Sequence, residues 1–400
     1  MAQPGPRARA LTRYFSNEHG FEAENYIAGV ILYKRRTVQG GVERIVVKHA
    51  RLGAWWQGDA RDPEIDSEEN LLRRLWGSEH TIRLLSVVDD RHHRAPVMWA
   101  PPLNRNLLNP PPILPWKLGV DPALYPNVTN VEFFVMEFLA RGTGEQLIER
   151  CEAMNIGEIS EPLLWCFFLC LTRGCIGMAY PPNRRNRNPP AVEREVLPPR
   201  GQPGPAASRI SHGDLHVENM MFGDYDFQAA QPSCHQIVPI LKVRQLDNIY
   251  GNLFTKGSQI IDFGLAHEDN TPAEAQRENM KFVGELMHQL ARVVLDPIVE
   301  DRHRPRYMIR NIPGLNDFET YATAEFCRAG NLSYDFKLLV CMCLAVDEAR
   351  RPTLRPVLEV CERNVGLTPN WMNLKDEVSE LFDAVPLLNN GSDSGSEYAP

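Results

Sequence analysis

The chain has 400 residues, of which 43% are hydrophobic and 24% charged, with a formal net charge of −8. This composition predicts a folded protein with a substantial core, and the negative charge argues against nucleic acid as the main partner. The first twenty residues lack the apolar run of a secretory signal, and the nine cysteines form no zinc-ligand spacing. We therefore expect a reducing intracellular location, cytoplasmic or nuclear.

Strand-like segments come first in the chain and helix-like segments later. Residues 27–33 and 44–50 are rich in β-branched side chains and predict strands. Residues 66–75 carry three leucines behind an acidic first turn, which predicts a helix. Residues 133–139 predict another strand, and most of the remaining chain predicts helices. This order indicates an α+β fold.

The longest apolar stretch is residues 163–180, and it predicts a buried helix rather than a membrane span because it contains Arg173 and two glycines. We therefore expect no membrane partner. Three stretches look inserted: residues 89–130, 181–208 and 223–258. The first two are dense in proline, which predicts surface loops. The polar end, residues 389–400, predicts disorder.

Two polar motifs stand out in the second half of the chain. Residues 212–219 read His-Gly-Asp-Leu-His-Val-Glu-Asn, and residues 260–265 read Ile-Ile-Asp-Phe-Gly-Leu. Magnesium prefers oxygen ligands, which Asn219 and Asp262 could supply. Asp214 is placed where a base could accept a proton from an attacking hydroxyl. Together they predict phosphoryl transfer, which depends on positioned metal ions and an oriented nucleophile.

These motifs resemble the catalytic loop and the metal-binding D-F-G motif of the eukaryotic protein-kinase superfamily. The resemblance implies a bilobal fold, with a small β-rich N-lobe and a larger helical C-lobe, that binds ATP and Mg²⁺. It implies that Asp214 is the catalytic base and that Asn219 and Asp262 hold magnesium. More narrowly, the chain resembles a group of fungal proteins with degenerate kinase domains.

The same resemblance extends to the first half of the chain. Ile-Val-Val-Lys over residues 45–48 resembles the strand whose lysine, here Lys48, pairs with a glutamate on the next helix. Glu68 is the expected partner, because the leucines of residues 66–75 follow it at helical spacing. Glu69 places those apolar neighbours less well.

Residues 134–139, Phe-Val-Met-Glu-Phe-Leu, resemble the hinge between the lobes. The resemblance implies that backbone groups of Glu137 and Leu139 bond adenine. It places Met136 at the gatekeeper position, and it implies that adenine is sandwiched between Val46 and Met221.

Two further segments resemble the C-lobe. Residues 279–284 resemble the start of its large buried helix, and residues 343–353 resemble its closing motif. The expected organisation is therefore an N-terminal extension over 1–19, an N-lobe over 20–139, a C-lobe over 140–370 and a tail over 371–400.

The sequence departs from the family pattern around the phosphates. The glycine-rich loop is missing, because residues 19–30 contain only Gly20 and Gly29. His216 stands in place of the lysine that neutralises the transferred phosphate, and Gly213 in place of the usual arginine. We expect a weaker grip on phosphate.

A second departure concerns the activation segment. No Ala-Pro-Glu motif stands between residues 265 and 278, which leaves Arg351 without its usual glutamate partner. Glu274 and Glu278 are the candidate substitutes.

Three functions remain open. The catalytic set favours an active kinase that acts on a Ser/Thr hydroxyl of a protein or peptide. The missing glycines favour a pseudokinase, a binding or scaffold module with little turnover. The His-Gly-Asp-Leu-His form favours a small-molecule kinase of the aminoglycoside or choline kinase type.

Overall fold

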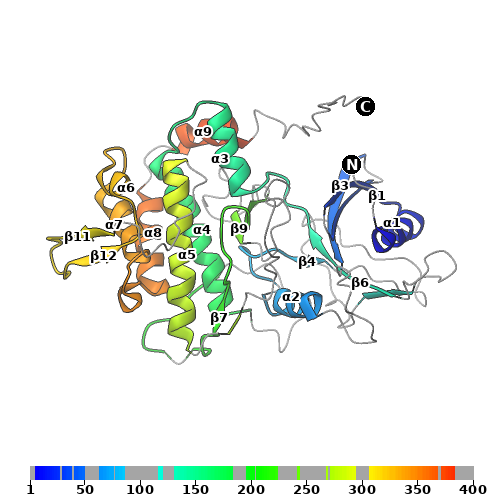
Figure 1. Ribbon diagram of the computed structural model, residues 1–400, viewed down its shortest axis with the longest axis horizontal. Helices are drawn as coiled ribbons and strands as arrows, with labels where there is room; N and C mark the ends of the chain where they lie inside the picture. The colour runs from blue at the N-terminus through cyan, green and yellow to red at the C-terminus, as the bar shows by residue number, and fades with distance from the viewer. Residues whose placement is uncertain are drawn as a thin grey trace, which may run out of the picture.

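A computed structural model describes residues 5–27, 29–37, 40–49, 63–75, 77–85, 116–119, 130–182, 195–202, 204–223, 241–243, 267–268, 271–293, 306–367 and 371–382. These residues form the α+β fold that the sequence predicts. An antiparallel sheet with two helices lies at one end of the molecule, and the remaining helices lie together at the other end (Figure 1).

The sheet places Lys48 near its centre. Its strand order is β1-β2-β3-β6-β4, and β5 pairs with the same edge of β6 as β4. All of its pairs are antiparallel. The strands are β1 (Glu22–Ile27), β2 (Val30–Arg36), β3 (Val42–His49), β4 (Leu84–Leu85), β5 (Trp116–Gly119) and β6 (Asn130–Glu137). Lys48 lies on β3, which has a strand on either side.

Each face of the sheet is covered by one helix. Side chains alternate between the faces of a strand, so Ile45 and Val47 of β3 point to one face and Val46 to the other. Ile45 and Val47 pack with Phe15 of α1 (Pro6–His19), whereas Val46 packs with a cluster that includes Leu72 of α2 (Pro63–Leu75). The segment expected to be an N-terminal extension thus contains a helix that completes the core of the sheet.

The first predicted strand is wrong at one point. Residues 27–33 form the end of β1 and the start of β2, because Ile27 pairs with Val30 across a connection of two residues, 28 and 29. Gly29 adopts a φ of 97°, a conformation that glycine reaches without steric cost. Its carbonyl accepts a hydrogen bond from the His49 N–H at 2.8 Å.

The helical end is built around α4 (Glu161–Ala179). By length and composition this helix could cross a membrane, but 94% of its apolar window is buried inside the protein. It packs against α5 (Pro272–Arg292) and α8 (Leu354–Gly366), which Figure 1 shows beside it. The prediction of a buried helix is confirmed. The other helices here are α3 (Gly144–Ala153), α6 (Ala324–Arg328), α7 (Tyr334–Cys343) and α9 (Trp371–Phe382).

Parts of the three inserted stretches belong to the fold and differ from the surface loops that we expected. β5 lies in the first stretch, and β9 (Leu241–Val243) in the third pairs with β8 (Met220–Phe222). In the second, the Glu195 side chain is 3% exposed, and the Pro198 carbonyl accepts a hydrogen bond from Arg355 of α8. The segment expected to be a tail contains α9, whose Val378 is buried in the helical core. Residues 389–400 lie outside the described residues.

Candidate active site

The predicted lysine–glutamate pair forms across the sheet and α2. The Lys48 Nζ lies 2.5 Å from Glu68 Oε2, and the two side chains are 6% and 0% exposed. Glu69 instead pairs with Arg73 one helical turn later. Lys48 therefore pairs with Glu68 and not with Glu69, as the position of the apolar residues on α2 predicts. The pair is shielded from water, so salt screens it little.

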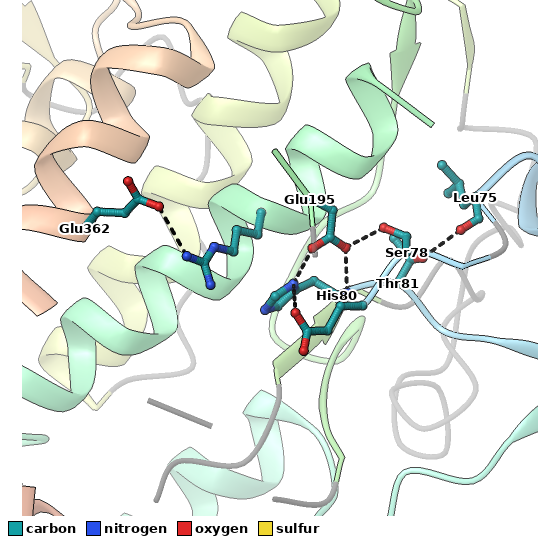
Figure 2. A network of polar contacts seen from close by, with 8 residues as sticks. Leu75, Ser78, His80, Thr81, Glu195 and Glu362 are labelled. Carbon is teal, nitrogen blue, oxygen red and sulfur yellow. Dashed lines mark hydrogen bonds and ion pairs between the residues drawn. The ribbon is translucent and has the colours of Figure 1, made fainter. Parts of the chain in front are cut away.

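A buried network lies just after the end of α2, where Ser78 and Thr81 donate hydrogen bonds to the Leu75 carbonyl (Figure 2). Glu195 Oε1 accepts hydrogen bonds from Ser78 Oγ at 2.5 Å and from the His80 N–H at 2.7 Å, and Glu195 Oε2 lies 2.7 Å from His80 Nδ1. Burial raises the pKa of Glu195, but the bonds and charge of His80 outweigh it and lower the pKa to about 2. Glu195 is therefore a buried carboxylate that ties the second inserted stretch to the loop between α2 and β4.

Glu79 lies beside this network, and together with His80 and Glu195 it forms a group of three residues that could hold a metal ion. The nearest ligand atoms of Glu79, His80 and Glu195 lie within 4.8 Å of one another. Both Glu195 oxygens, however, already have short bonds to Ser78 and His80. The cluster is thus satisfied as a hydrogen-bond network, which favours a structural role.

The predicted catalytic loop is anchored from α5. Asn279 of α5 accepts a hydrogen bond from the His212 N–H at 2.8 Å and donates one to the Ile210 carbonyl at 3.0 Å. Both groups are buried, so the amide satisfies two backbone groups that water does not reach. The loop that follows is thereby fixed to the most buried face of the helix. The sequence motifs assigned no role to Asn279; the signal was a polar residue inside an apolar helical stripe.

Three predicted site residues converge within this loop. The Asn219 Nδ2 donates to the Asp214 carbonyl at 2.7 Å and lies 3.3 Å from Asp214 Oδ2. It also lies 2.9 Å from His216 Nε2, which is itself 3.5 Å from Asp214 Oδ2. Asn219 is buried, whereas the Asp214 and His216 side chains are 36% and 28% exposed. A buried amide thus orients a carboxylate and an imidazole that remain open to solvent.

Acidic neighbours favour the charged form of His216. Burial lowers the pKa of His216, but the hydrogen bond and charge of Asp214, together with Glu218 and Glu145, raise it above the ordinary value of 6.5. Burial raises the pKa of the Glu218 carboxyl in turn, and burial and the charge of Glu218 raise that of Glu145. The loop therefore presents a cation to its surroundings over a wider pH range than an isolated histidine would.

The residues expected around adenine form one apolar cluster. Met136 and Leu139, from β6 and the segment after it, pack with Met221 of β8, and Val46 of β3 packs against the same cluster. The Glu137 N–H donates to the Arg83 carbonyl at 3.1 Å, and the Glu137 carboxylate binds the Arg83 guanidinium. The Glu137 N–H therefore already has a partner within the protein.

The predicted metal ligand Asp262 is not described by the structure, but part of the segment after it is. Asp262 lies outside the described residues, so its distance from Asn219 stays a prediction. The segment after it is anchored, because His267 of β10 (His267–Glu268) pairs with Ser211 of β7 (Ile210–Ser211), just before the catalytic loop.

Arg351 has neither of its candidate partners. It donates to the Ala345 carbonyl at 3.0 Å and pairs with Glu348 at 3.4 Å. Glu274 caps the start of α5, and Glu278 accepts a hydrogen bond from Ser211. Neither Glu274 nor Glu278 therefore replaces the missing glutamate partner of Arg351.

No protein-family model matches the chain, and no curated protein matches it. The likeness to protein kinases therefore depends on the motifs and on the geometry described above.

Proposed function

We propose that this chain is an ATP-dependent phosphotransferase with a bilobal protein-kinase-like fold, which transfers the ATP γ-phosphate to a Ser/Thr hydroxyl of a protein. The observation that carries the proposal is the buried Lys48–Glu68 pair. Burying two charges costs several kcal/mol for each ion, and their attraction does not always recover it. A buried lysine that is held in place by a glutamate can bind a second anion. In kinases this anion is the phosphate group of the nucleotide.

Apolar side chains from both ends of the molecule support a nucleotide site beside this pair. Val46 and Met136 come from the sheet, and Met221 from the helical end. In our proposal adenine lies between Val46 and Met221, and it bonds the Glu137 carbonyl and the Leu139 N–H. The phosphates then extend towards Lys48, which lies on the same face of β3 as Val46.

Asp214 has the position and exposure of a group that orients an acceptor. It is held by Asn219 yet keeps a solvent-exposed carboxylate, so an incoming hydroxyl can donate a hydrogen bond to it. In the proposed reaction Asp214 aligns that hydroxyl and takes its proton as the new O–P bond forms, while the bond from the γ-phosphorus to the bridging oxygen breaks and ADP leaves. His216, whose pKa is raised by Asp214 and its other acidic neighbours, would in its protonated form stabilise the charge on the transferred group in place of the missing lysine.

The donor atoms fit a magnesium ion. Asn219 donates from its NH₂ group to Asp214, so its amide oxygen is the atom that could bind a cation. Asp262 would supply the carboxylate. It stands five residues before His267, a span of at most roughly 17 Å, and His267 pairs beside the catalytic loop. Bound magnesium would neutralise phosphate charge.

One observation favours a pseudokinase as the second candidate. The two-residue connection between β1 and β2 contains one glycine, Gly29, in place of the G-x-G-x-x-G pattern whose backbone covers the phosphates in kinases. Binding without turnover would then be the function of the same site. This alternative keeps the nucleotide contacts and removes only the transfer.

Thermal unfolding with ATP and Mg²⁺ tests the nucleotide site. Ligand at 100 times its Kd stabilises the folded protein by about 2.7 kcal/mol, so we expect a rise in Tm of several degrees. Lys48→Met should abolish the rise, after correction for its own lower Tm. Lys34→Met is the matched control, because Lys34 is 41% exposed and pairs with the partly buried Glu24 of the neighbouring strand. No rise in the wild type, or an equal rise in Lys48→Met, would contradict the proposal.

Transfer of labelled phosphate then separates the functions. We expect label on Ser or Thr of a peptide library and none on aminoglycosides or choline, and we expect Asp214→Asn to abolish it. Nucleotide binding without transfer to either panel identifies the pseudokinase. Transfer to the small molecules alone identifies the third function. Transfer that persists at full rate in Asp214→Asn would remove Asp214 from the mechanism.

A further inference from the structure

Two cysteines of the helical end lie close together outside the proposed active site. The Sγ atoms of Cys327 and Cys341 are 3.6 Å apart. Cys327 lies on α6 and Cys341 on α7, which pack side by side. A disulfide needs its sulfur atoms about 2.05 Å apart, so closure requires a movement of about 1.5 Å, which side-chain rotation and a small shift of the five-residue α6 can supply.

The two thiols differ in access. Cys327 is partly exposed, while the other seven cysteines that the structure describes, Cys341 among them, are buried or nearly so. An oxidant in solution therefore reaches Cys327 first. Cys341 is buried, and its sulfur lies 3.6 Å from that of Cys327, so it is placed to react with a group on Cys327.

The surroundings of Cys327 favour its thiolate. The hydrogen bond with Cys341 lowers the pKa of Cys327, burial opposes this, and the charges of Lys337 and Arg328 lower the pKa further, while Glu325 raises it. Lys337 is held in place by a 2.6 Å hydrogen bond to the Ala329 carbonyl. The thiolate is the reactive form of cysteine. Geometry, access and charge thus agree on Cys327 as the nucleophile.

We propose that Cys327 and Cys341 form a reversible redox site, in which a peroxide oxidises Cys327 and Cys341 then closes a disulfide. In the first step the Cys327 sulfur attacks one peroxide oxygen and the O–O bond breaks. Cys327 becomes a sulfenic acid, and the other oxygen leaves as water. In the second step the Cys341 sulfur attacks the Cys327 sulfur, the S–O bond breaks, and a second water leaves with the Cys341 proton. Two thiols and one hydrogen peroxide thus give one disulfide and two waters.

The disulfide would fix the position of α6 against α7. The start of α7 is already tied to α4, because Ser333 bonds Glu161 through both its N–H and its hydroxyl. Further along, Cys343 of α7 packs against Gly284 of α5. Oxidation therefore acts on a part of the helical end that contacts the same helix as the catalytic loop. The redox site itself does not depend on the proposed kinase activity.

Peptide mapping of the folded, full-length protein tests the proposal. Trypsin cuts after Arg328 and Lys337, which places Cys327 and Cys341 on separate peptides. After treatment with hydrogen peroxide we expect these peptides to be linked, with a mass about 2 Da below their sum, and to separate again with dithiothreitol. No link at a peroxide concentration that oxidises glutathione completely would overturn the proposal.

Variants assign the two roles. Cys343 lies on the same peptide as Cys341 and is buried, so Cys343→Ser is the matched control and should still form the link. Cys341→Ser should instead leave a sulfenic acid on Cys327 that dimedone traps. A link that survives Cys341→Ser and disappears in Cys343→Ser would overturn the pairing.

The reactivity of Cys327 can also be measured in the wild-type protein, so this test does not depend on whether a variant folds. The rate of iodoacetamide reaction at Cys327, followed against pH, should show a midpoint below the ordinary thiol value. A midpoint at or above that value would overturn the role of Cys327 as nucleophile.

Discussion

The buried Glu195 carboxylate yields a stability prediction with a magnitude. Its pKa in the folded protein is about 2, against an ordinary value of 4.5. At about 1.4 kcal/mol for each pKa unit, this difference corresponds to about 3 kcal/mol of folding free energy at neutral pH. Glu195→Gln removes the charge and turns an NH₂ group towards Ser78 or His80. We therefore expect Glu195→Gln to lose about 2–4 kcal/mol of unfolding free energy at pH 7.

The pH dependence supplies a second test of the same residue. A group whose pKa is lowered by folding stabilises the protein above its unfolded pKa and loses that effect as pH falls through its folded pKa. The wild-type advantage over Glu195→Gln should thus be full above pH 5, about 1 kcal/mol smaller at pH 4, and about 2 kcal/mol smaller at pH 3. Urea unfolding followed by circular dichroism measures it at each pH.

A surface glutamate provides the control. Glu359 binds Arg200 at 2.6 Å but is 50% exposed, so Glu359→Gln should change the unfolding free energy by less than about 0.5 kcal/mol. If both substitutions have the same small effect at pH 7, or if the Glu195→Gln difference does not vary between pH 5 and pH 3, the buried-carboxylate reasoning is refuted.

Three further predictions concern the helical end and the catalytic loop. Because the pKa of His216 is raised, its stabilising effect is full below pH 6.5 and lost as pH rises through the folded pKa; the urea-unfolding difference from His216→Gln should shrink from pH 6 to pH 8. Asn279→Ala unpairs the two backbone groups that the amide holds and should cost about 2–4 kcal/mol by urea unfolding, whereas Asn364→Ala, which loses one helical contact, should cost under about 1 kcal/mol. Gly284→Ala places a Cβ 2.7 Å from α7 and should lower stability by about 1–3 kcal/mol in calorimetry, while Gly366→Ala, which meets nothing within 4 Å, should not.

Each of these has an outcome that contradicts it. If the difference in unfolding free energy between the wild type and His216→Gln does not vary with pH, the imidazole of His216 is not stabilised in its charged form by the loop. Equal losses for Asn279→Ala and Asn364→Ala would mean that the anchor on α5 is not satisfied as described. A fully stable Gly284→Ala would mean that α5 and α7 can move apart at no cost.

Local patterns in the sequence were enough for the elements whose residues contact near neighbours. The β-branched run of β3 and the leucine spacing of α2 predicted the strand and the helix. The resemblance to protein kinases predicted that Lys48 pairs with a glutamate of that helix, and the leucine spacing favoured Glu68. The apolar run of α4 predicted a buried helix. In each case the side-chain period is set by the backbone geometry of the element itself, so a short window of sequence carries the information.

Long-range contacts decided what the sequence alone left open. Nothing near Glu195 in a proline-rich stretch indicates that it will meet His80, 115 residues earlier, and nothing near Asn279 indicates that it will hold His212. In the sequence, Gly29 is only a weak turn signal. The turn is seen in the structure because Ile27 and Val30 pair across it. Such contacts form when distant segments are packed together, and their partners satisfy buried polar groups that have no partner within their own segment. The sequence therefore determined the elements with a strong local period and suggested the candidate site residues, and only the tertiary structure decided which of those residues meet.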